Sequence, residues 1–253
     1  MDTSCTAEDL ADERVIKEIN ANNENAQNGR SCSDQEQRSS FYSNAKNYWE
    51  TVSPTIDGML GGFARISPTD INGSKAFLRP FVMGDKATTG RKRALDCGAG
   101  IGRITKRLLL TMFETVDMVE QNQIFLDQAE KFLGAERNRV ERCICSGLQE
   151  FTPEEGRYDV IWCQWVLGHL TDSDLVDFFH RCRKGLSTNG IMCLKENVKD
   201  GSERDFDEQD SSWTRLREEL EKLIEESGFR ILKKQKQRGF PKPLYDVYMY
   251  ALQ

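Results

Sequence analysis

Two kinds of hydrophobic periodicity alternate along most of this chain. Short apolar runs of strand length are separated by segments in which apolar residues recur every three or four positions, as they do on one face of a helix. The strand-like runs are residues 93–97, 116–120, 140–145, 158–164 and 191–195. The helical patterns are residues 101–113, 123–133, 172–186 and 213–227. Because strands that alternate with helices form a parallel sheet covered on both faces, the pattern predicts an α/β fold.

The two ends of the chain depart from this alternation. Residues 229–235 and 245–252 are strand-like and are joined by a loop with Gly and Pro but no helix, which predicts an antiparallel pair at the sheet edge. Residues 1–40 are acidic and offer little to bury, so we expect a disordered tail. Aromatic residues become frequent from Phe41 onward. We therefore place the folded domain at residues 41–253, with a helical cap over about residues 41–90, including a helix at 69–81.

Composition narrows the class of protein. With 253 residues, 38% hydrophobic and 30% charged, the chain suits one sizeable domain. Of its 41 acidic and 35 basic residues, nine and four lie in residues 1–40, so the remainder carries 32 and 31 and is nearly neutral. A broad basic surface is therefore not expected, and we predict that no nucleic acid is the acceptor.

Other sequence features concern location and metals. No apolar run approaches the ~20 residues that cross a bilayer, and residues 1–9 do not form a secretory signal, so we expect no membrane association and a protein that stays inside the cell. We assign it to nucleus and cytoplasm. The eight cysteines include no Cys-x-x-Cys pair, and only two histidines accompany them. We expect reduced cysteines and no metal site.

A glycine-rich motif follows the first strand-like run. Residues 95–102 read Leu-Asp-Cys-Gly-Ala-Gly-Ile-Gly, and Glu120 ends the next strand-like run, 22 residues after Gly98. Glycines let the backbone approach a nucleotide closely, and an acid at the end of the second strand can bind both ribose hydroxyls. Alone, such a turn can simply join strand to helix. The acid and the continuing strand–helix series favour an adenosine-containing cofactor.

The spacing within this motif is Gly-x-Gly-x-Gly, whereas dinucleotide enzymes use Gly-x-Gly-x-x-Gly. The form resembles motif I of Rossmann-like methyltransferases. This resemblance implies S-adenosylmethionine as cofactor, and a mostly parallel seven-stranded sheet with a reversed edge strand and helices on both faces.

A narrower resemblance covers about residues 41–252. The eukaryotic N-terminal Xaa-Pro-Lys N-methyltransferase family is similar to this chain at Trp49 and at residues 57–62, 95–110, 147–149, 159–172 and 210–212. The resemblance implies transfer of methyl groups from S-adenosylmethionine to the α-amine of protein N-termini that start Xaa-Pro-Lys or Xaa-Pro-Arg.

The same resemblance implies roles for individual residues. It implies cofactor contacts at Trp49, Gly98, Arg103, Glu120, Leu148, Gln149 and Gln164. It implies a peptide channel that involves Leu60, Ile66, Trp165, His169, Asn197, Asp207, Asp210, Ser212 and Tyr245.

The chemistry of an α-amine explains why such residue types are needed. An α-amine has a pKa of about 7.7–8.0, so near neutrality most of it is protonated and cannot attack a methyl group. His169 and Asp210 are the candidate proton acceptors, and Asn197 could orient the amine through its amide oxygen. Asp210 alone would favour the ammonium form, so we expect His169 or a water path to remove the proton finally.

Each residue also has a structural alternative. His169 at a strand-to-helix junction could be a capping or solvated histidine, and Asp207 and Asp210 could belong to a solvated acidic loop. Trp162 is better interpreted as a core residue, whereas Trp165 beyond the strand end could stack on a substrate proline. Two other functions stay open: a methyltransferase for a small molecule or RNA, and a non-catalytic scaffold with the same fold.

Overall fold

The computed structural model describes residues 34–253, which fall in two units, Met1–Ser43 and Asn44–Gln253. Residues 34–51 are helical, so residues 34–40, which the sequence assigned to the tail, have helical structure. The rest of the predicted tail lies outside the described residues. In the first unit the rings of Phe41 and Tyr42 meet edge to face at 5.2 Å.

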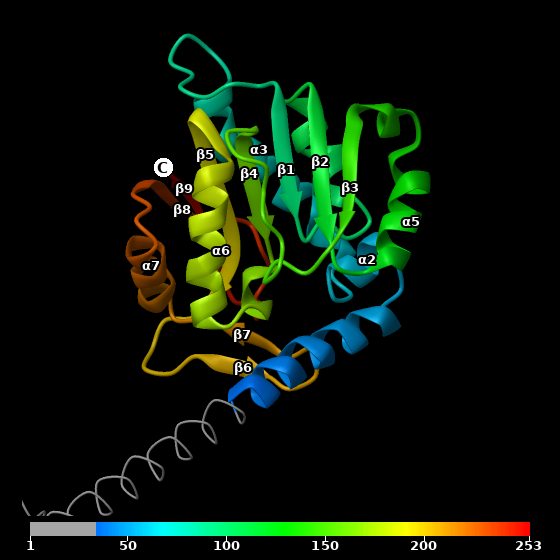
Figure 1. The fold of residues 1–253 in the computed structure, drawn as a ribbon, viewed down its shortest axis with the longest axis vertical. Coiled ribbons are helices and arrows are strands. Elements are labelled where there is room, and N and C mark those ends of the chain that lie inside the picture. The colour runs from blue at the N-terminus through cyan, green and yellow to red at the C-terminus, as the bar shows by residue number, and fades with distance from the viewer. Residues whose placement is uncertain (1–33) are drawn as a thin grey trace, which may run out of the picture. The chain divides into compact units, whose positions relative to one another are not determined.

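The second unit contains a seven-stranded sheet with the order β3-β2-β1-β4-β5-β9-β8 (Figure 1). Its strands are β1 (Arg93–Cys97), β2 (Thr115–Glu120), β3 (Val140–Cys145), β4 (Tyr158–Gln164), β5 (Leu186–Val198), β8 (Ile231–Lys236) and β9 (Asp246–Leu252). The first five pair in parallel, and β9 runs antiparallel to both β5 and β8. The predicted fold class is therefore confirmed. The reversed strand is β9, which lies between β5 and the edge strand β8.

Helices lie on both faces of the sheet, α6 in front of it and α3 behind it in the view of Figure 1. The α-helices after residue 51 are α2 (Ile56–Met59), α3 (Ser67–Val82), α4 (Arg103–Arg107), α5 (Gln123–Leu133), α6 (Asp172–Gly185) and α7 (Arg217–Glu226). The short 3-10 helices are η1 (Ala64–Ile66), η2 (Leu109–Thr111), η3 (Gly134–Arg139) and η4 (Leu167–His169).

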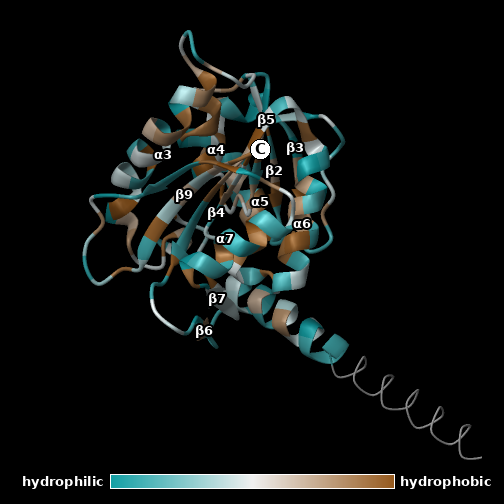
Figure 2. Cartoon of the chain, turned by 90° about the vertical axis from the view of Figure 1, so that its left-hand side faces the viewer, coloured by the Kyte–Doolittle hydropathy of each residue, from teal (hydrophilic) through white to brown (hydrophobic). Residues whose placement is uncertain are grey.

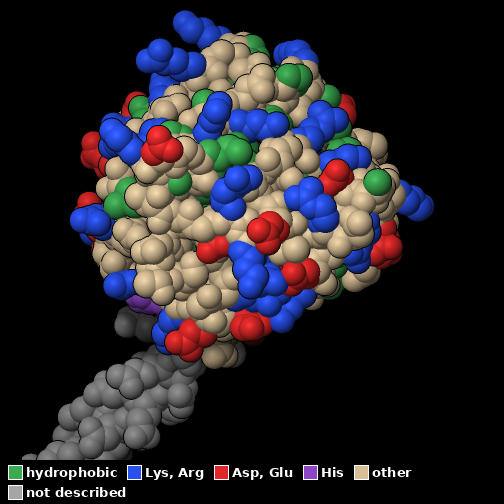
Figure 3. Space-filling view, turned by 90° about the horizontal axis from the view of Figure 1, so that it is seen from above, with side chains coloured by type: hydrophobic (Ala, Val, Ile, Leu, Met, Phe, Trp, Pro, Cys, Tyr) green, Lys and Arg blue, Asp and Glu red, His purple; other side chains and the backbone are tan. Residues whose placement is uncertain are grey.

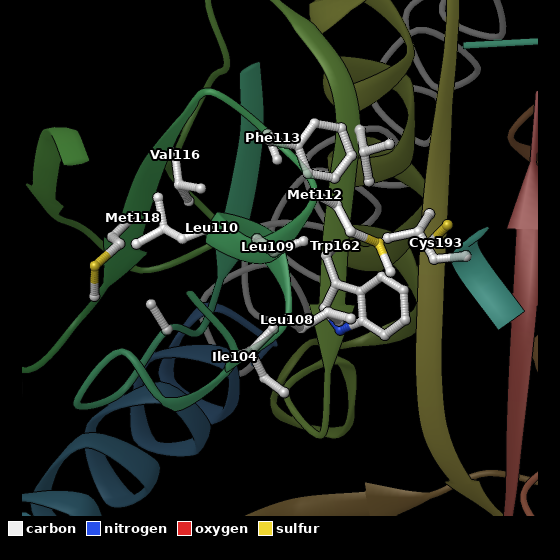
Figure 4. Packing of buried hydrophobic residues seen from close by; sticks show 14 of the residues in the cluster. Ile104, Leu108, Leu109, Leu110, Met112, Phe113, Val116, Met118, Trp162 and Cys193 are labelled. Atoms are coloured by element: carbon white, nitrogen blue, oxygen red, sulfur yellow. The ribbon is translucent and has the colours of Figure 1, made fainter. Parts of the chain in front are cut away.

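The core lies between the sheet and these helices. Trp162 on β4 is fully buried and packs in the same cluster as Leu108, Met112 and Cys193, which come from other elements (Figure 4). Its assignment to the core is therefore confirmed. Hydrophobic residues occupy the strands, and the outward helix surfaces are largely hydrophilic (Figure 2). Burial of this apolar surface is the main favourable contribution to folding.

The segment after the glycine motif is less helical than its spacing suggested. The backbone leaves the helix at Leu108, so α4 ends at Arg107 and the 3-10 helix η2 follows. Beyond η2, the carbonyl of Met112 accepts a hydrogen bond from Arg91 Nε at 2.7 Å. Side-chain donors from distant segments thus satisfy carbonyls that a longer helix would have bonded internally.

The predicted helix over residues 213–227 is also shorter, because its first residues pair as a strand. The strands β6 (Asp205–Asp207) and β7 (Ser212–Thr214) form a two-stranded sheet that the sequence did not predict. The rings of Phe206 and Trp213 pack across it at 4.6 Å. This hairpin lies beyond the carboxyl ends of the parallel strands, where ligands bind in such folds (Figure 1).

The surface and the cysteines complete the description. Figure 3 shows the face at the amino ends of the parallel strands, where acidic side chains are interspersed among the lysines and arginines. Among residues 34–253, no helix has the length and apolar character that crossing a membrane requires. All six cysteines in this part of the chain are free, and only Cys143 and Cys145 are exposed.

A buried ion pair near the amino ends of the strands gives a test of the fold. Asp117 is fully buried and accepts hydrogen bonds from Arg157 Nε at 2.8 Å and from the Tyr158 hydroxyl at 3.0 Å. Asp117→Ala should lower the free energy of unfolding by about 3 kcal/mol or more, because both donors lose their buried acceptor. Urea denaturation measures this. The exposed ion pair of Glu154 with Arg142 provides the control, since Glu154→Ala should change stability little.

Candidate active site

The glycine motif forms a tight turn at the carboxyl end of β1. Gly98 and Gly100 have φ values of 67° and 53°, a left-handed conformation that glycine adopts without steric cost. The N–H groups of Gly98 and Ala99 both donate to the Val119 carbonyl on β2. A Cβ on Gly98 would lie 2.5 Å from a Val166 methyl, and one on Gly100 would lie 2.6 Å from the sulfur of Met59. Only glycine therefore fits this turn.

Glu120 lies beside the turn at the end of β2. It is 8% exposed, and its two carboxylate oxygens accept hydrogen bonds from the N–H groups of Gly100 and Asn122, each at 2.9 Å. Burial raises its pKa, and these N–H donors oppose the shift. Each oxygen keeps a further lone pair, so the carboxylate can accept from both hydroxyls of a ribose.

Arg103 and Gln164 meet at a residue that the sequence did not single out. Asp70 on α3 accepts a hydrogen bond from Arg103 at 2.6 Å on one oxygen and from Gln164 Nε2 at 2.8 Å on the other. Lys195 on β5 forms an ion pair with the second oxygen at 2.6 Å. The guanidinium of Arg103 also lies 5.6 Å from the Trp165 ring centre. Two predicted cofactor residues and one predicted peptide residue thus lie together.

Leu148 and Gln149 lie in the loop after β3. Leu148 is buried, and the side chain of Arg181 on α6 donates to the carbonyls of Leu148, Gln149 and Phe151 at 2.8–3.2 Å. One arginine therefore fixes the loop at the carboxyl edge of the sheet.

His169 contacts Trp49 rather than a solvated surface. The Trp49 indole N–H donates to His169 Nε2 at 3.0 Å, and the two rings meet edge to face. His169 Nδ1 lies 3.4 Å from the Ser211 carbonyl, which can only accept, so Nδ1 carries the proton. Burial lowers the pKa of His169, and the nearby Asp210 opposes this shift. The imidazole is therefore neutral near pH 7.

Two buried polar atoms near this histidine have no hydrogen-bond partner among residues 34–253. They are Oδ1 of Asp210 and Nε1 of Trp165. Buried polar groups are rarely left unpaired, so these two atoms are candidates for contact with a ligand. Tyr48 lies near enough to feel the charges of Asp210 and Asp207. Burial raises its pKa, and these two charges raise it further.

The remaining predicted peptide residues differ in their surroundings. Leu60 and Ile66 are buried, and Ser212 begins β7 against the turn that carries His169. Asn197 is exposed at the end of β5, and Tyr245, 45% exposed, donates to Asp205 at 3.0 Å. Asp207 is exposed and accepts from a backbone N–H within its own turn.

Buried charged residues that sequence reasoning missed hold the turn between β4 and α6. Arg215 is 3% exposed and donates to the carbonyls of Leu167 and Leu170 at 2.8 and 2.5 Å, on both sides of His169. The carboxyl of Glu196 accepts from the N–H groups of Val166 and Leu167, and burial raises its pKa to about 7. A charged residue within an apolar strand was the available signal for Lys195 and Glu196.

A seven-stranded sheet with one reversed strand, the glycine turn and the carboxylate at the end of β2 are the features of an S-adenosylmethionine-dependent methyltransferase. The family described as AdoMet dependent proline di-methyltransferase matches residues 37–253, and the chain belongs to this family.

Individual relatives agree with this assignment. The N-terminal Xaa-Pro-Lys N-methyltransferase 1-A of Xenopus laevis is 52% identical over 218 residues, covering 86% of this chain and 97% of the relative. The N-terminal Xaa-Pro-Lys N-methyltransferase 1 of Homo sapiens is 48% identical over 217 residues, with the same coverage of both chains. A solved SAM-dependent methyltransferase from Leishmania major superposes with a TM-score of 0.78 at 38% identity, covering 84% of this chain and 83% of that one.

The glycine turn gives a test of cofactor binding. Gly98→Asp should weaken binding of S-adenosylhomocysteine by about 100-fold or more, because it fills the turn and adds a charge like that of the ligand carboxylate. Isothermal titration measures the affinity. Gly156→Asp is the matched control, since Gly156 has a similar φ of 65° but has open space around its Cβ position. Unchanged affinity in Gly98→Asp would show that the turn only connects β1 to α4.

Proposed function

We propose that this protein transfers methyl groups from S-adenosylmethionine to the α-amine of protein N-termini that start Xaa-Pro-Lys or Xaa-Pro-Arg. The observation that carries the proposal is the unpaired, buried Oδ1 of Asp210, next to a neutral His169. A carboxylate oxygen without a donor is suited to bind a cationic α-ammonium group. The printed names of the relatives support this acceptor.

The arrangement suggests how the amine loses its proton. S-adenosylmethionine supplies an activated methyl group and becomes S-adenosylhomocysteine. The ammonium first pairs with Asp210 and then gives its proton to His169 Nε2 or to a water, which frees the nitrogen lone pair for bond formation. His169 can accept only when Trp49 no longer donates to Nε2, so peptide binding must displace this hydrogen bond. Asn197 orients the amine.

Recognition of the next two peptide residues follows from nearby side chains. Trp165 lies 6.3 Å from Phe240, ring centre to ring centre, and offers an aromatic surface for proline. Leu60, Ile66, Ser212 and Tyr245 line the rest of the channel. Asp207 pairs with the lysine or arginine at the third position.

The domain and location assignments are part of the same proposal. Residues 41–90 act as a cap in which Trp49 helps to close the site, and the protein works in the nucleus and cytoplasm on protein substrates. An RNA acceptor is less favourable, because acidic side chains at Asp207 and Asp210 would repel phosphates. The intact glycine turn and Glu120 disfavour a non-catalytic scaffold.

One experiment tests the acceptor directly. The protein is incubated with S-adenosylmethionine and peptides that start Ser-Pro-Lys, with free or acetylated N-termini, and the products are weighed. We expect a mass increase in steps of one methyl group on the free peptide alone. Methylation of the acetylated peptide, or of neither, would reject the proposal.

The proton acceptor gives a prediction about pH. His169→Ala or Asp210→Asn should lower turnover at pH 7 by about 10²–10⁴-fold, the usual contribution of a general base. The loss should shrink as the pH rises above the pKa of the amine, about 7.7–8.0, because the substrate then arrives neutral. Turnover of a Ser-Pro-Lys peptide is measured from pH 6 to 10 with saturating cofactor.

The chain's other histidine supplies the control for this profile. His180 on α6 is exposed, and His180→Ala should leave turnover unchanged at every pH. Near-normal turnover of His169→Ala at neutral pH would mean that Asp210 or a water accepts the proton. If Asp210→Asn also kept its turnover, the proposed active site would be wrong.

Substrate choice depends on the charge at residue 207. Asp207→Lys should lower the kcat/KM ratio of Ser-Pro-Lys over Ser-Pro-Glu peptides by about tenfold, since attraction becomes repulsion and each exposed pair contributes up to about 1 kcal/mol. Glu208→Lys makes the same charge change next to it and should alter the ratio much less. An unchanged ratio in Asp207→Lys would assign the third position to another residue.

A further inference from the structure

A buried cluster of one carboxylate and two cations lies beside the glycine turn. The side chains of Asp70 and Lys195 are 0% exposed, and that of Arg103 is 6% exposed. Within residues 34–253, Asp70 is the only carboxylate in ion-pair distance of either cation. The buried carboxyl of Asp96 accepts a hydrogen bond from the Thr105 hydroxyl, and burial raises its pKa to about 7, a shift that the charge of Arg103 opposes. The cluster therefore has one positive charge in excess.

The surroundings of Lys195 suit an ammonium group. Besides the ion pair, its Nζ donates to the Asp70 carbonyl at 3.1 Å, the Ser74 hydroxyl at 3.0 Å and Gln237 Oε1 at 2.8 Å. With the Asp70 carboxylate these partners offer four oxygens, each able to accept, to the three protons of an ammonium group. Burial lowers the pKa of Lys195, and the adjacent carboxylate of Asp70 opposes that shift.

Arg103 has donors left for a ligand. Among the described residues, its guanidinium makes one side-chain hydrogen bond, to Asp70, out of five available N–H donors. Gln164, which donates to the Asp70 oxygen that also pairs with Lys195, lies at the end of β4. The open donors thus lie at the carboxyl edge of the sheet, where the cofactor binds in this class of fold.

An uncompensated buried charge is costly, and a neutral pair of Asp70 with Arg103 would avoid that cost. We propose that Lys195 is a positioning residue that balances the charge of Asp70, so that the cluster keeps a net positive charge at Arg103 for the carboxylate of the methionine moiety. Asp70, Arg103, Lys195 and the ligand carboxylate together are neutral. Lys195 thereby makes the site selective for ligands that have this carboxylate, whichever acceptor the enzyme methylates.

The test compares two ligands that differ in one group. S-adenosylhomocysteine carries the carboxylate, and its decarboxylated analogue does not. In Lys195→Met, affinity for S-adenosylhomocysteine should fall about tenfold or more, whereas affinity for the analogue should change less than about threefold. Isothermal titration of the full chain measures both. Lys233→Met is the control: Lys233 on β8 is half-buried and packs over Phe77 of α3, and its loss should change neither affinity.

A double variant distinguishes charge from packing. Asp70→Asn combined with Lys195→Met removes one charge of each sign and returns the excess to one positive charge on Arg103. It should recover the preference of the unmodified protein for the carboxylate ligand to within about threefold. If Lys195→Met does not fold, this double variant still tests the preference. The proposal would be overturned if Lys195→Met lost affinity for both ligands equally, or if the double variant did not recover the preference for the carboxylate ligand.

Discussion

A carboxylate that stays ionised without access to water needs compensating cations or hydrogen bonds, and at Asp70 the cations come from distant parts of the chain. Arg103 begins α4 directly after the glycine turn, and Lys195 lies within β5. Their hydrogen bonds to Asp70, together with that of Gln164, fix α3 against the ends of β1, β4 and β5. Removing one member of such a buried group typically costs about 3–5 kcal/mol. The position of Arg103 and Gln164 therefore depends on this one interaction.

Adjacent residues of β5 support two groups of candidate site residues, one around Asp70 and the other around His169. Side chains alternate along a strand, so Lys195 and Glu196 point to opposite faces of the sheet. Lys195 contacts Asp70 on α3. Glu196 instead accepts hydrogen bonds from the N–H groups of Val166 and Leu167, at the start of the turn that leads to His169. Between them, the Lys195 carbonyl accepts the N–H of Trp165, a non-glycine residue held at a φ of 54°. Such strain persists only where the surroundings over-determine it, as at ligand sites.

The part of the site that we propose for the peptide is built differently from the part around the glycine turn. It consists of a hairpin and turns that side chains hold in place, with Arg215 bonded to the two carbonyls that flank His169. The indole N–H of Trp49 donates to Nε2 of that histidine and so occupies its lone pair. Loops positioned by a rigid scaffold can differ between enzymes that share a cofactor domain. We therefore propose that the acceptor is decided here, and not in the sheet.

The sequence alone determined the alternation of strands and helices in the main sheet, the glycine turn and the acid at Glu120. These features depend on local periodicity and on spacing within some 25 residues, and the strands 93–97, 140–145 and 158–164 have those bounds in the structure. Resemblance to a family supplied the list of site residues, but not the contacts that hold them. Only the tertiary structure decided that Asp70 lies between Arg103 and Lys195, that residues 205–214 form a hairpin, and that Trp49 donates to His169. These interactions join residues up to 125 positions apart, and no local pattern encodes which partner a buried charge or a polar ring will find once the elements pack.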